Sequence, residues 1–199
     1  MSSRELILKT IRRNRPAIDA PLPTPIPFTT APVTMALIEQ FRTALAIYGG
    51  KTLELPAGMS VQALIDELYP ERPALCSATR EIVGSHPIPA VNRPQELATI
   101  EIGVTRAAFG VAETGSVFLS ETELQVNALG YLVERLIILL DPAVMLETLQ
   151  EAYARPEFRT AGYAVLMTGP SATADIEGVL IRGAQGVRSL TVILCPRAG

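Results

Sequence analysis

The chain has 199 residues, of which 48% are hydrophobic, 19% charged and 5% aromatic, and its formal net charge at pH 7 is −3. This length predicts one domain with a sizeable core, and the mild acidity, with no cluster of Lys and Arg, argues against a nucleic-acid partner, which requires a basic face. The longest apolar run, Leu136 to Leu140, is too short to cross a bilayer, so no membrane partner is expected.

Residues 2–14 are predicted to form a short helix. Ser2 and Glu5 have the spacing of a capping box, and Leu6, Ile7 and Ile11 make a narrow apolar stripe. Six prolines follow between residues 16 and 32, and each favours extended geometry in the residue before it. We therefore expect residues 1–32 to be a helix and proline-rich arm, and 33–199 to be the domain. Such an arm can lie on its own domain, join a homo-oligomer or bind another partner.

The first half of the domain alternates helical and strand patterns. Thr34 is expected to open a helix with apolar residues from Leu37 to Tyr48, ended by Gly49-Gly50, and Ser60 to cap a second helix that ends at Pro70. Strands are predicted at residues 52–55, 75–77, 82–83 and 100–104. Helix and strand in alternation predict an α/β fold with a mostly parallel sheet flanked by helices.

The middle of the domain has a different pattern. Residues 108–112 and 117–119 are expected to form two strands around a turn at Gly115, with little helix. Leu136 to Leu140 is a continuous apolar strand, buried on both faces. Asp141 and Pro142 then provide an N-cap and a first-turn proline, which predict a helix that continues beyond Met145.

The candidate site begins at Gly169-Pro170-Ser171-Ala172-Thr173-Ala174-Asp175-Ile176-Glu177-Gly178, between the apolar runs 163–167 and 190–195. The pattern predicts a buried strand, a sharp turn, and a helix with an acidic first turn. Ligands of α/β sheets lie outside the carboxyl ends of strands, and free N–H groups at a helix start favour a phosphate or carboxylate. Alternatively, Ser171 or Thr173 caps the helix and leaves no N–H group free for a ligand.

Two blocks of sequence resemble the lactate-utilisation protein C family, the LUD domain. The decapeptide from Gly169 is similar to the family's Gly-Pro-Ser-Arg-Thr-Ala-Asp-Ile-Glu, and residues 103–117, with Ala112-Glu113-Thr114-Gly115-Ser116, are similar to its Gly-Ile-Thr … Ala-Glu-Thr-Gly-Thr block. The resemblance implies the fold of the sugar-phosphate isomerase and CoA-transferase superfamily. It also implies a role in oxidising L-lactate to pyruvate beside iron–sulfur oxidoreductase partners.

Glu113 is the one candidate catalytic residue. CoA transferases of that superfamily carry a nucleophilic Glu in a Glu-Asn-Gly turn, which Glu113-Thr114-Gly115 resembles, and a carboxylate can form an acyl anhydride and pass the acyl group on. The alternative is that Glu113 accepts hydrogen bonds from backbone donors in its turn.

Eight residues of the two blocks and their surroundings are candidates for binding a small anionic metabolite: Thr105, Thr114, Gly115, Gly169, Ser171, Thr173, Asp175 and Gln185. Two of the family's polar residues are replaced, since Ala172 stands where the family has Arg and Gln185 where it has His. Alanine cannot clamp an anion, and glutamine cannot exchange protons near neutral pH. These replacements indicate altered or lost anion chemistry.

Metal and cofactor chemistry have no support in the sequence. Cys76 and Cys195 are too far apart for a cysteine metal motif, and His86 is the lone histidine. The thiols are expected to be free and buried, and with no signal peptide at the N-terminus this predicts a cytoplasmic protein. No cofactor follows from the sequence.

Three functions remain open. The first is an accessory or ligand-binding protein of L-lactate utilisation. The second is an enzyme that acts through Glu113 on a small phosphorylated or CoA-linked metabolite. The third is a degenerate homologue without turnover.

Overall fold

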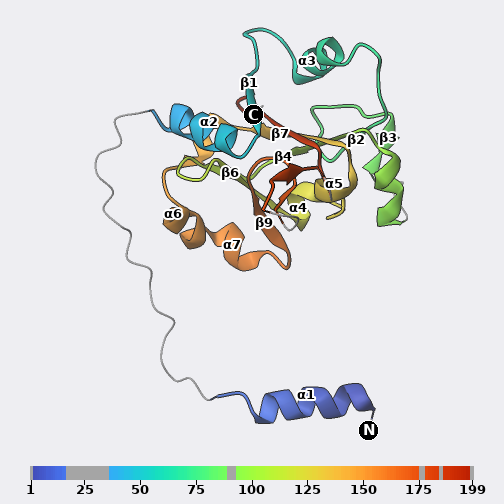
Figure 1. The fold of residues 1–199 in the computed structure, drawn as a ribbon, viewed down its shortest axis with the longest axis vertical. Helices are drawn as coiled ribbons and strands as arrows, with labels where there is room; N and C mark the ends of the chain where they lie inside the picture. Colours follow the sequence, from blue (N-terminus) through green and yellow to red (C-terminus); the bar gives the residue numbers. More distant parts are fainter. Residues whose placement is uncertain (1, 17–35, 89–92, 175–177, 184–185, 198–199) are drawn as a thin grey trace.

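The computed structural model describes residues 2–16, 36–88, 93–174, 178–183 and 186–197 (Figure 1). Helix α1 (Ser3–Arg13) begins the chain, and its capping box between Ser2 and Glu5 forms as predicted. None of the residues of α1 is buried. The expected helix start at Thr34 and most of the proline-rich arm lie outside the described residues.

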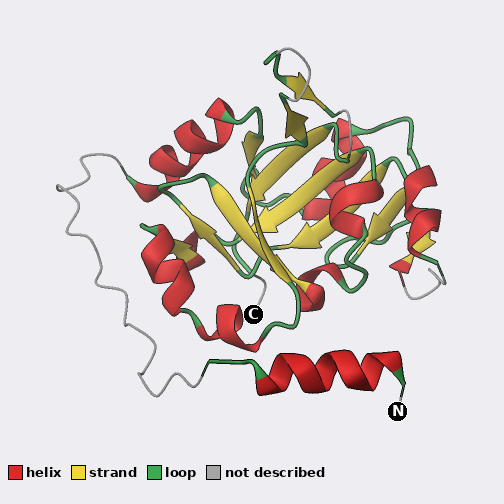
Figure 2. Cartoon of the chain, turned by 60° about the horizontal axis from the view of Figure 1, so that its bottom comes forward, coloured by secondary structure: helices red, strands yellow, loops and turns green. Residues whose placement is uncertain are grey.

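The centre of the domain is a sheet of six parallel strands in the order β1-β12-β7-β4-β2-β3. Strand β7 is apolar from Leu136 to Leu140, and β12 is apolar except for Ser189 and Thr191, because helices pack on both faces of this sheet. The strands are β1 (Lys51–Glu54), β2 (Leu75–Ser77), β3 (His86–Pro87), β4 (Ile102–Arg106), β7 (Arg135–Leu140) and β12 (Ser189–Leu194). The predicted α/β class with a mostly parallel sheet flanked by helices is confirmed (Figure 2).

A second sheet of four strands, in the order β8-β5-β6-β9, comes from the middle of the chain. The predicted pair of strands around Gly115 is its antiparallel centre, with Phe109 opposite Phe118. The strands are β5 (Phe109–Val111), β6 (Ser116–Ser120), β8 (Met145–Leu146) and β9 (Ala164–Met167).

Helices α2 (Leu37–Ile47) and α3 (Val61–Leu68) cover opposite faces of the large sheet. Phe41 and Leu45 of α2 pack with the even-numbered residues of β7 and β12, and Ile65 of α3 packs with Ile137 and Ile193. The other helices are η2 (Pro94–Thr99), α4 (Glu121–Leu124), α5 (Leu129–Leu132), η3 (Pro142–Val144), α6 (Leu149–Ala154) and α7 (Pro156–Thr160). None of the described helices is long and apolar enough to cross a membrane.

Two predicted elements are wrong. Residues 82–83 are loop, with Ile82 buried and Val83 84% exposed, and the strand of this region is β3 instead. The helix predicted from Asp141 is only the short η3, although Asp141 does cap it by accepting from the N–H of Ala143 at 2.9 Å. Pairing of Met145 with Gly110 of β5 makes the chain extended there, which stops the helix.

The helix predicted after Gly169-Pro170 is also wrong. Ala172–Thr173 (β10) and Ile181–Arg182 (β11) form an antiparallel hairpin, with Ala172 opposite Arg182. The N–H of Gly183 donates to the carbonyl of Ser171 at 2.7 Å and closes its base. Ala172 and Thr173 therefore continue into a hairpin rather than into a helix that starts at Ser171. Asp175 and Glu177 of the predicted first turn lie outside the described residues.

Candidate functional site

The two sequence blocks meet at one end of the second sheet. Strands β6 and β9 are antiparallel neighbours, with Val117 opposite Met167, so the turn before β6 meets the turn after β9. A chain of hydroxyl groups joins them: Thr114 Oγ1 lies 2.7 Å from Ser116 Oγ, which is hydrogen-bonded to Thr168 Oγ1. Ser116 is 4% exposed, so this chain is mostly shielded from water.

Gly115 and Gly169 hold helix α2 in place. Both have positive φ, +63° and +69°. A Cβ atom at Gly115 would lie 2.2 Å from the backbone nitrogen of Leu45, and one at Gly169 would lie 2.5 Å from the carbonyl oxygen of Tyr48. The approach of the α2 backbone to both turns therefore explains why these positions hold glycine.

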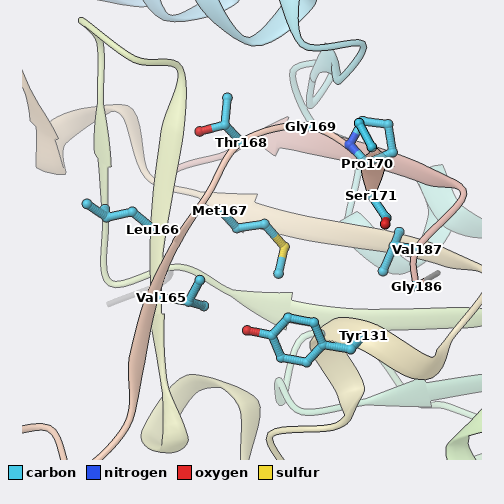
Figure 3. A pocket seen from close by; sticks show the side chains of 12 residues that line it. Tyr131, Val165, Leu166, Met167, Thr168, Gly169, Pro170, Ser171, Gly186 and Val187 are labelled. Atoms are coloured by element: carbon cyan, nitrogen blue, oxygen red, sulfur yellow. The ribbon is translucent and has the colours of Figure 1, made fainter. Parts of the chain in front are cut away.

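A cavity of about 310 Å³ opens beside the turn Gly169-Pro170-Ser171 (Figure 3). Figure 3 shows the side chains of Tyr131, Met167 and Val187 around it. Strand β9 supplies one wall, α5 another, and the base of the hairpin closes the third. Its lining consists of Gly130, Tyr131, Val165, Leu166, Met167, Thr168, Gly169, Pro170, Ser171, Ala172, Gly186 and Val187.

The lining carries hydroxyl groups but no charged side chain among the residues described there. Ser171 presents its hydroxyl near the turn, whereas the side chain of Thr168 points away from Tyr131 and Met167 and is hydrogen-bonded to Ser116 (Figure 3). The hydroxyl of Tyr131 is hydrogen-bonded to that of Tyr163. Burial, and then the contact with Tyr163, raise the pKa of Tyr131, so its phenol stays protonated and neutral. Such a cavity suits uncharged carbonyl or hydroxyl groups with a small apolar body, because a bare anion would lose hydration without gaining a cation.

Glu113 is used as a helix cap. Its Oε2 accepts a hydrogen bond from the N–H of Leu149, the first residue of α6, at 2.8 Å. The N–H of Glu113 donates in turn to the carbonyl of Glu147 at 3.0 Å. A carboxylate is favoured at a helix start by the free N–H groups and the helix dipole. The side chain is exposed and does not line the cavity.

The structure brings some predicted ligand residues to the cavity and separates others from it. Gly169 and Ser171 line it, whereas Thr114 lies outside the lining and is linked through Ser116 to Thr168. Thr105 is 0% exposed and donates to the carbonyl of Glu123 at 2.6 Å, away from the lining. Thr173 lies on β10 beyond Ala172, outside the lining. Asp175 and Gln185 lie outside the described residues.

Comparison with known families supports the placement of these blocks. The model of the LUD domain matches residues 58–195, which is more than half of the chain. The chain belongs to the LUD domain family. The match lies within the predicted domain of 33–199, and family membership supports a role related to lactate utilisation in general.

A solved structure has the same LUD-type fold. It is a DUF162 family protein from Deinococcus radiodurans, 17% identical in sequence, with a TM-score of 0.62 over 79% of this chain and 95% of that one. At this level of identity the likeness concerns the fold alone. Among functionally curated proteins, none matches the chain significantly.

Sequence reasoning missed several residues of the cavity. Thr168 directly precedes the signature turn, and the Thr-Gly-Pro-Ser run was a signal that could have found it. Tyr131 and Gly130 come from α5, about forty residues earlier in the chain, and no local pattern marks them. Met167 was identified only as part of an apolar strand, although its side chain forms a wall.

A second polar cluster lies at the carboxyl ends of strands in the large sheet. Arg106, the last residue of β4, is 8% exposed and pairs with Glu81; it also donates to the carbonyl oxygen of Cys195 at 3.3 Å and contacts its Sγ at 3.2 Å. Burial alone would raise the pKa of Glu81, but hydrogen bonds from Arg106 and Thr79 outweigh it, so this pKa is lowered.

Burial raises the pKa of the Cys195 thiol and of the Cys76 thiol, and neither thiol is in a disulfide. We therefore interpret the cluster of Arg106, Glu81 and Cys195 as structural. Within the described part of the chain, no group of three or more His, Cys, Asp or Glu side chains could hold a metal ion.

Proposed function

We propose that this LUD-family protein is a ligand-binding accessory protein of L-lactate utilisation, acting in the cytoplasm in the oxidation of L-lactate to pyruvate. One observation carries the proposal: the signature turn Gly169-Pro170-Ser171 forms one wall of a cavity whose described lining offers hydroxyls and apolar surface. Family membership supplies the lactate-related context. In this proposal Ser171 contacts the ligand, while Tyr131 and Met167 shape its space.

Binding without turnover is favoured by the position of Glu113. Its carboxylate already accepts from the N–H of Leu149 and lies outside the cavity lining. A nucleophile that attacked an acyl group would have to give up this hydrogen bond and reach a ligand from outside the cavity. Glu113 therefore acts as a positioning residue that fixes α6 against the turn before β6.

The uncharged lining also selects among ligands. An acyl group joined through an ester, amide or thioester has a carbonyl but no charge at the joined end, so it is compatible with the cavity. This favours the CoA-linked ligands of the second hypothesis over phosphorylated ones, with the acyl end inside the cavity. Thr114, Gly115 and Gly169 then act by holding the turns, and Thr173, Asp175 and Gln185 remain proposed ligand contacts.

Oxidation of lactate to pyruvate releases electrons and protons, and an oxidoreductase must accept the electrons. We infer an iron–sulfur oxidoreductase as the partner, as family resemblance implies. Neighbouring genes that encode iron–sulfur oxidoreductases would support the inference, and a gene neighbourhood without any would count against it.

A thermal-shift panel tests the ligand class. The panel compares L-lactate and pyruvate with their uncharged analogues L-lactamide and methyl pyruvate, and adds a CoA ester and a sugar phosphate. The proposal expects the uncharged analogues and the CoA ester to raise the unfolding midpoint more than the free acids do. A rise with the sugar phosphate alone would reject the proposed ligand class, and no rise with any compound would favour the degenerate homologue.

A further inference from the structure

Helix α1 carries an apolar stripe that nothing in the described chain covers. Leu6, Ile7 and Ile11 are 57%, 59% and 60% exposed. Three exposed aliphatic side chains on one stripe of an eleven-residue helix are unfavourable in water. A helix this short is also marginal alone, since tertiary packing supplies most helical stability. Both facts favour a helix that docks on another surface.

The domain has an incompletely covered face. Among the described helices, α3 alone packs on the side of the large sheet that carries Ile137 and Ile193, and it has eight residues. Both faces of a parallel sheet are normally covered by helices. Beside the end of α3 lies a hollow of about 250 Å³, lined by Lys51, Leu53, Leu68, Tyr69, Ile137, Thr191 and Ile193. Leu68 is 41% exposed at its rim.

Charge matches the two surfaces. Apart from Glu5, the charged residues of α1 are basic: Arg4, Lys9, Arg12 and Arg13. The exposed side of α3 and the turn after it are mainly acidic, since Asp66, Glu67 and Glu71 outnumber Arg72 there. Lys51 in the hollow offers a partner for Glu5. Amphipathic helices bind apolar grooves through such anchors, and flanking charges set orientation and partner choice.

The tether directs α1 to another molecule. Residues 14–36 join it to α2, which lies on the opposite face of the sheet from α3. Their proline-rich composition predicts a semi-rigid spacer that reaches about 70 Å at ~3.1 Å per residue. Docking of α1 in the hollow of its own domain would require this segment to pass around the edge of the sheet, whereas the hollow of a second copy imposes no such path.

We propose that α1 docks in the hollow beside α3 of a second copy of this chain. Leu6, Ile7 and Ile11 contact Leu53, Leu68 and Tyr69 of that copy, and the basic residues of α1 face its Asp66 and Glu67. Two copies exchange arms reciprocally, so that each contact occurs twice in a closed dimer. The dimer leaves the cavity at Gly169-Pro170-Ser171 unused, so its existence is independent of the proposed ligand.

Sedimentation velocity of the full chain tests the dimer. The expected result is a dimer for the unaltered chain and monomers for Ile7→Asp and for Leu68→Asp. Val179→Asp is the matched control, because Val179 is also 60% exposed but lies between β10 and β11 and not in α1 or in the lining of the hollow. This variant should remain a dimer. Unfolding midpoints measured on every variant separate loss of assembly from loss of folding. An unaltered chain that sediments as a monomer at all concentrations would overturn the proposal.

Disulfide trapping distinguishes the two possible occupants. Tagged chains with Ile7→Cys are mixed with untagged chains carrying Leu68→Cys and oxidised; the native thiols, Cys76 and Cys195, are buried. The expected product is a disulfide-linked pair of one tagged and one untagged chain. A chain that carries both substitutions is oxidised in parallel. If the disulfide forms only within that chain and not between the mixed chains, α1 docks on its own domain and the exchange is overturned.

Discussion

At the scale of single residues, Glu113 shows how a carboxylate can be committed to structure. It accepts from the first N–H of α6 and thereby ties this helix to the turn before β6. We expect Glu113→Ala to lower the free energy of unfolding by about 1 kcal/mol, the usual loss for a removed cap, and Glu113→Gln to lose less because the amide oxygen still accepts. Chemical unfolding in urea measures both changes.

The same variants separate a cap from a nucleophile. Since Glu113 does not line the cavity, ligands should raise the unfolding midpoint of Glu113→Gln as much as that of the unaltered chain. A fully stable Glu113→Gln protein that no longer responds to any ligand would show that the carboxylate takes part in binding or chemistry.

The pair of Arg106 and Glu81 makes stability depend on pH. In the folded state the pKa of Glu81 is lowered. The stabilisation from the ion pair is therefore fully present above the ordinary carboxyl pKa of about 4.3, and it is lost as pH falls through the lowered pKa of Glu81. Glu81→Gln leaves the buried Arg106 without its counterion, and we expect a loss of about 2 kcal/mol or more at pH 7.

Urea unfolding between pH 7 and pH 3 checks this prediction. The fall in stability at acid pH should be smaller in Glu81→Gln than in the unaltered chain. Glu134→Gln is the control, because Glu134 pairs with Arg188 at 3.6 Å on the surface, where a pair contributes less than about 1 kcal/mol. Equal losses in the two variants would contradict the account.

At the scale of elements, α2 depends on two glycine turns. A Cβ at Gly115 would meet the backbone of Leu45, and that backbone cannot move without shifting the helix. We expect Gly115→Ala to cost about 3 kcal/mol or more from strain at positive φ and overpacking together. Gly58→Ala is the matched control, because Gly58 has φ of +78° but open space around it, so only backbone strain of about 1 to 2 kcal/mol applies. Losses of the same size at both positions would show that the contact with α2 is unimportant.

Elements whose signals are local were predictable from the sequence. Ser60 capping α3 and the continuous apolar run of β7 are examples, because propensity, cap and burial all agree there. The helix after Gly169 failed because Ala172 and Thr173 instead pair with β11, and pairing partners ten residues apart leave no trace in a local pattern. The prediction that the helix from Asp141 continues beyond Met145 failed for the same kind of reason, because Met145 pairs with the distant Gly110.

The candidate site was predictable only in part. Gly169 and Ser171 were found because the resemblance marks their turn, and both line the cavity. The cavity itself also needs Tyr131 from α5 and Val187 from beyond the hairpin, and only the folded chain brings these segments together. The alternative for Glu113 was hydrogen bonds from backbone donors in its own turn, but the donor is the N–H of Leu149, 36 residues away, which no local pattern identifies.

At the scale of the whole molecule, we assign ligand binding and assembly to two different surfaces. The second sheet and its turns build the cavity, while the α3 side of the large sheet carries the hollow that we propose as the docking site for the arm of a second copy. Ligand binding and assembly should therefore be separable: Leu68→Asp should abolish the dimer and keep the ligand response. Thermal shift and sedimentation on this one variant measure both properties, and simultaneous loss of both in a folded protein would contradict the separation.

The central claim is that the cavity beside Gly169-Pro170-Ser171 is an uncharged binding site, and calorimetric titration of L-lactamide and L-lactate tests it most directly. Ser171→Ala is the informative variant, since it removes a hydroxyl from the turn that lines the cavity and leaves the other described lining residues unchanged. We predict that the unaltered chain binds L-lactamide more tightly than L-lactate, and that Ser171→Ala weakens L-lactamide binding about tenfold, the equivalent of about 1.4 kcal/mol. Tighter binding of L-lactate than of L-lactamide, or identical affinities in Ser171→Ala and the unaltered chain, would contradict the claim.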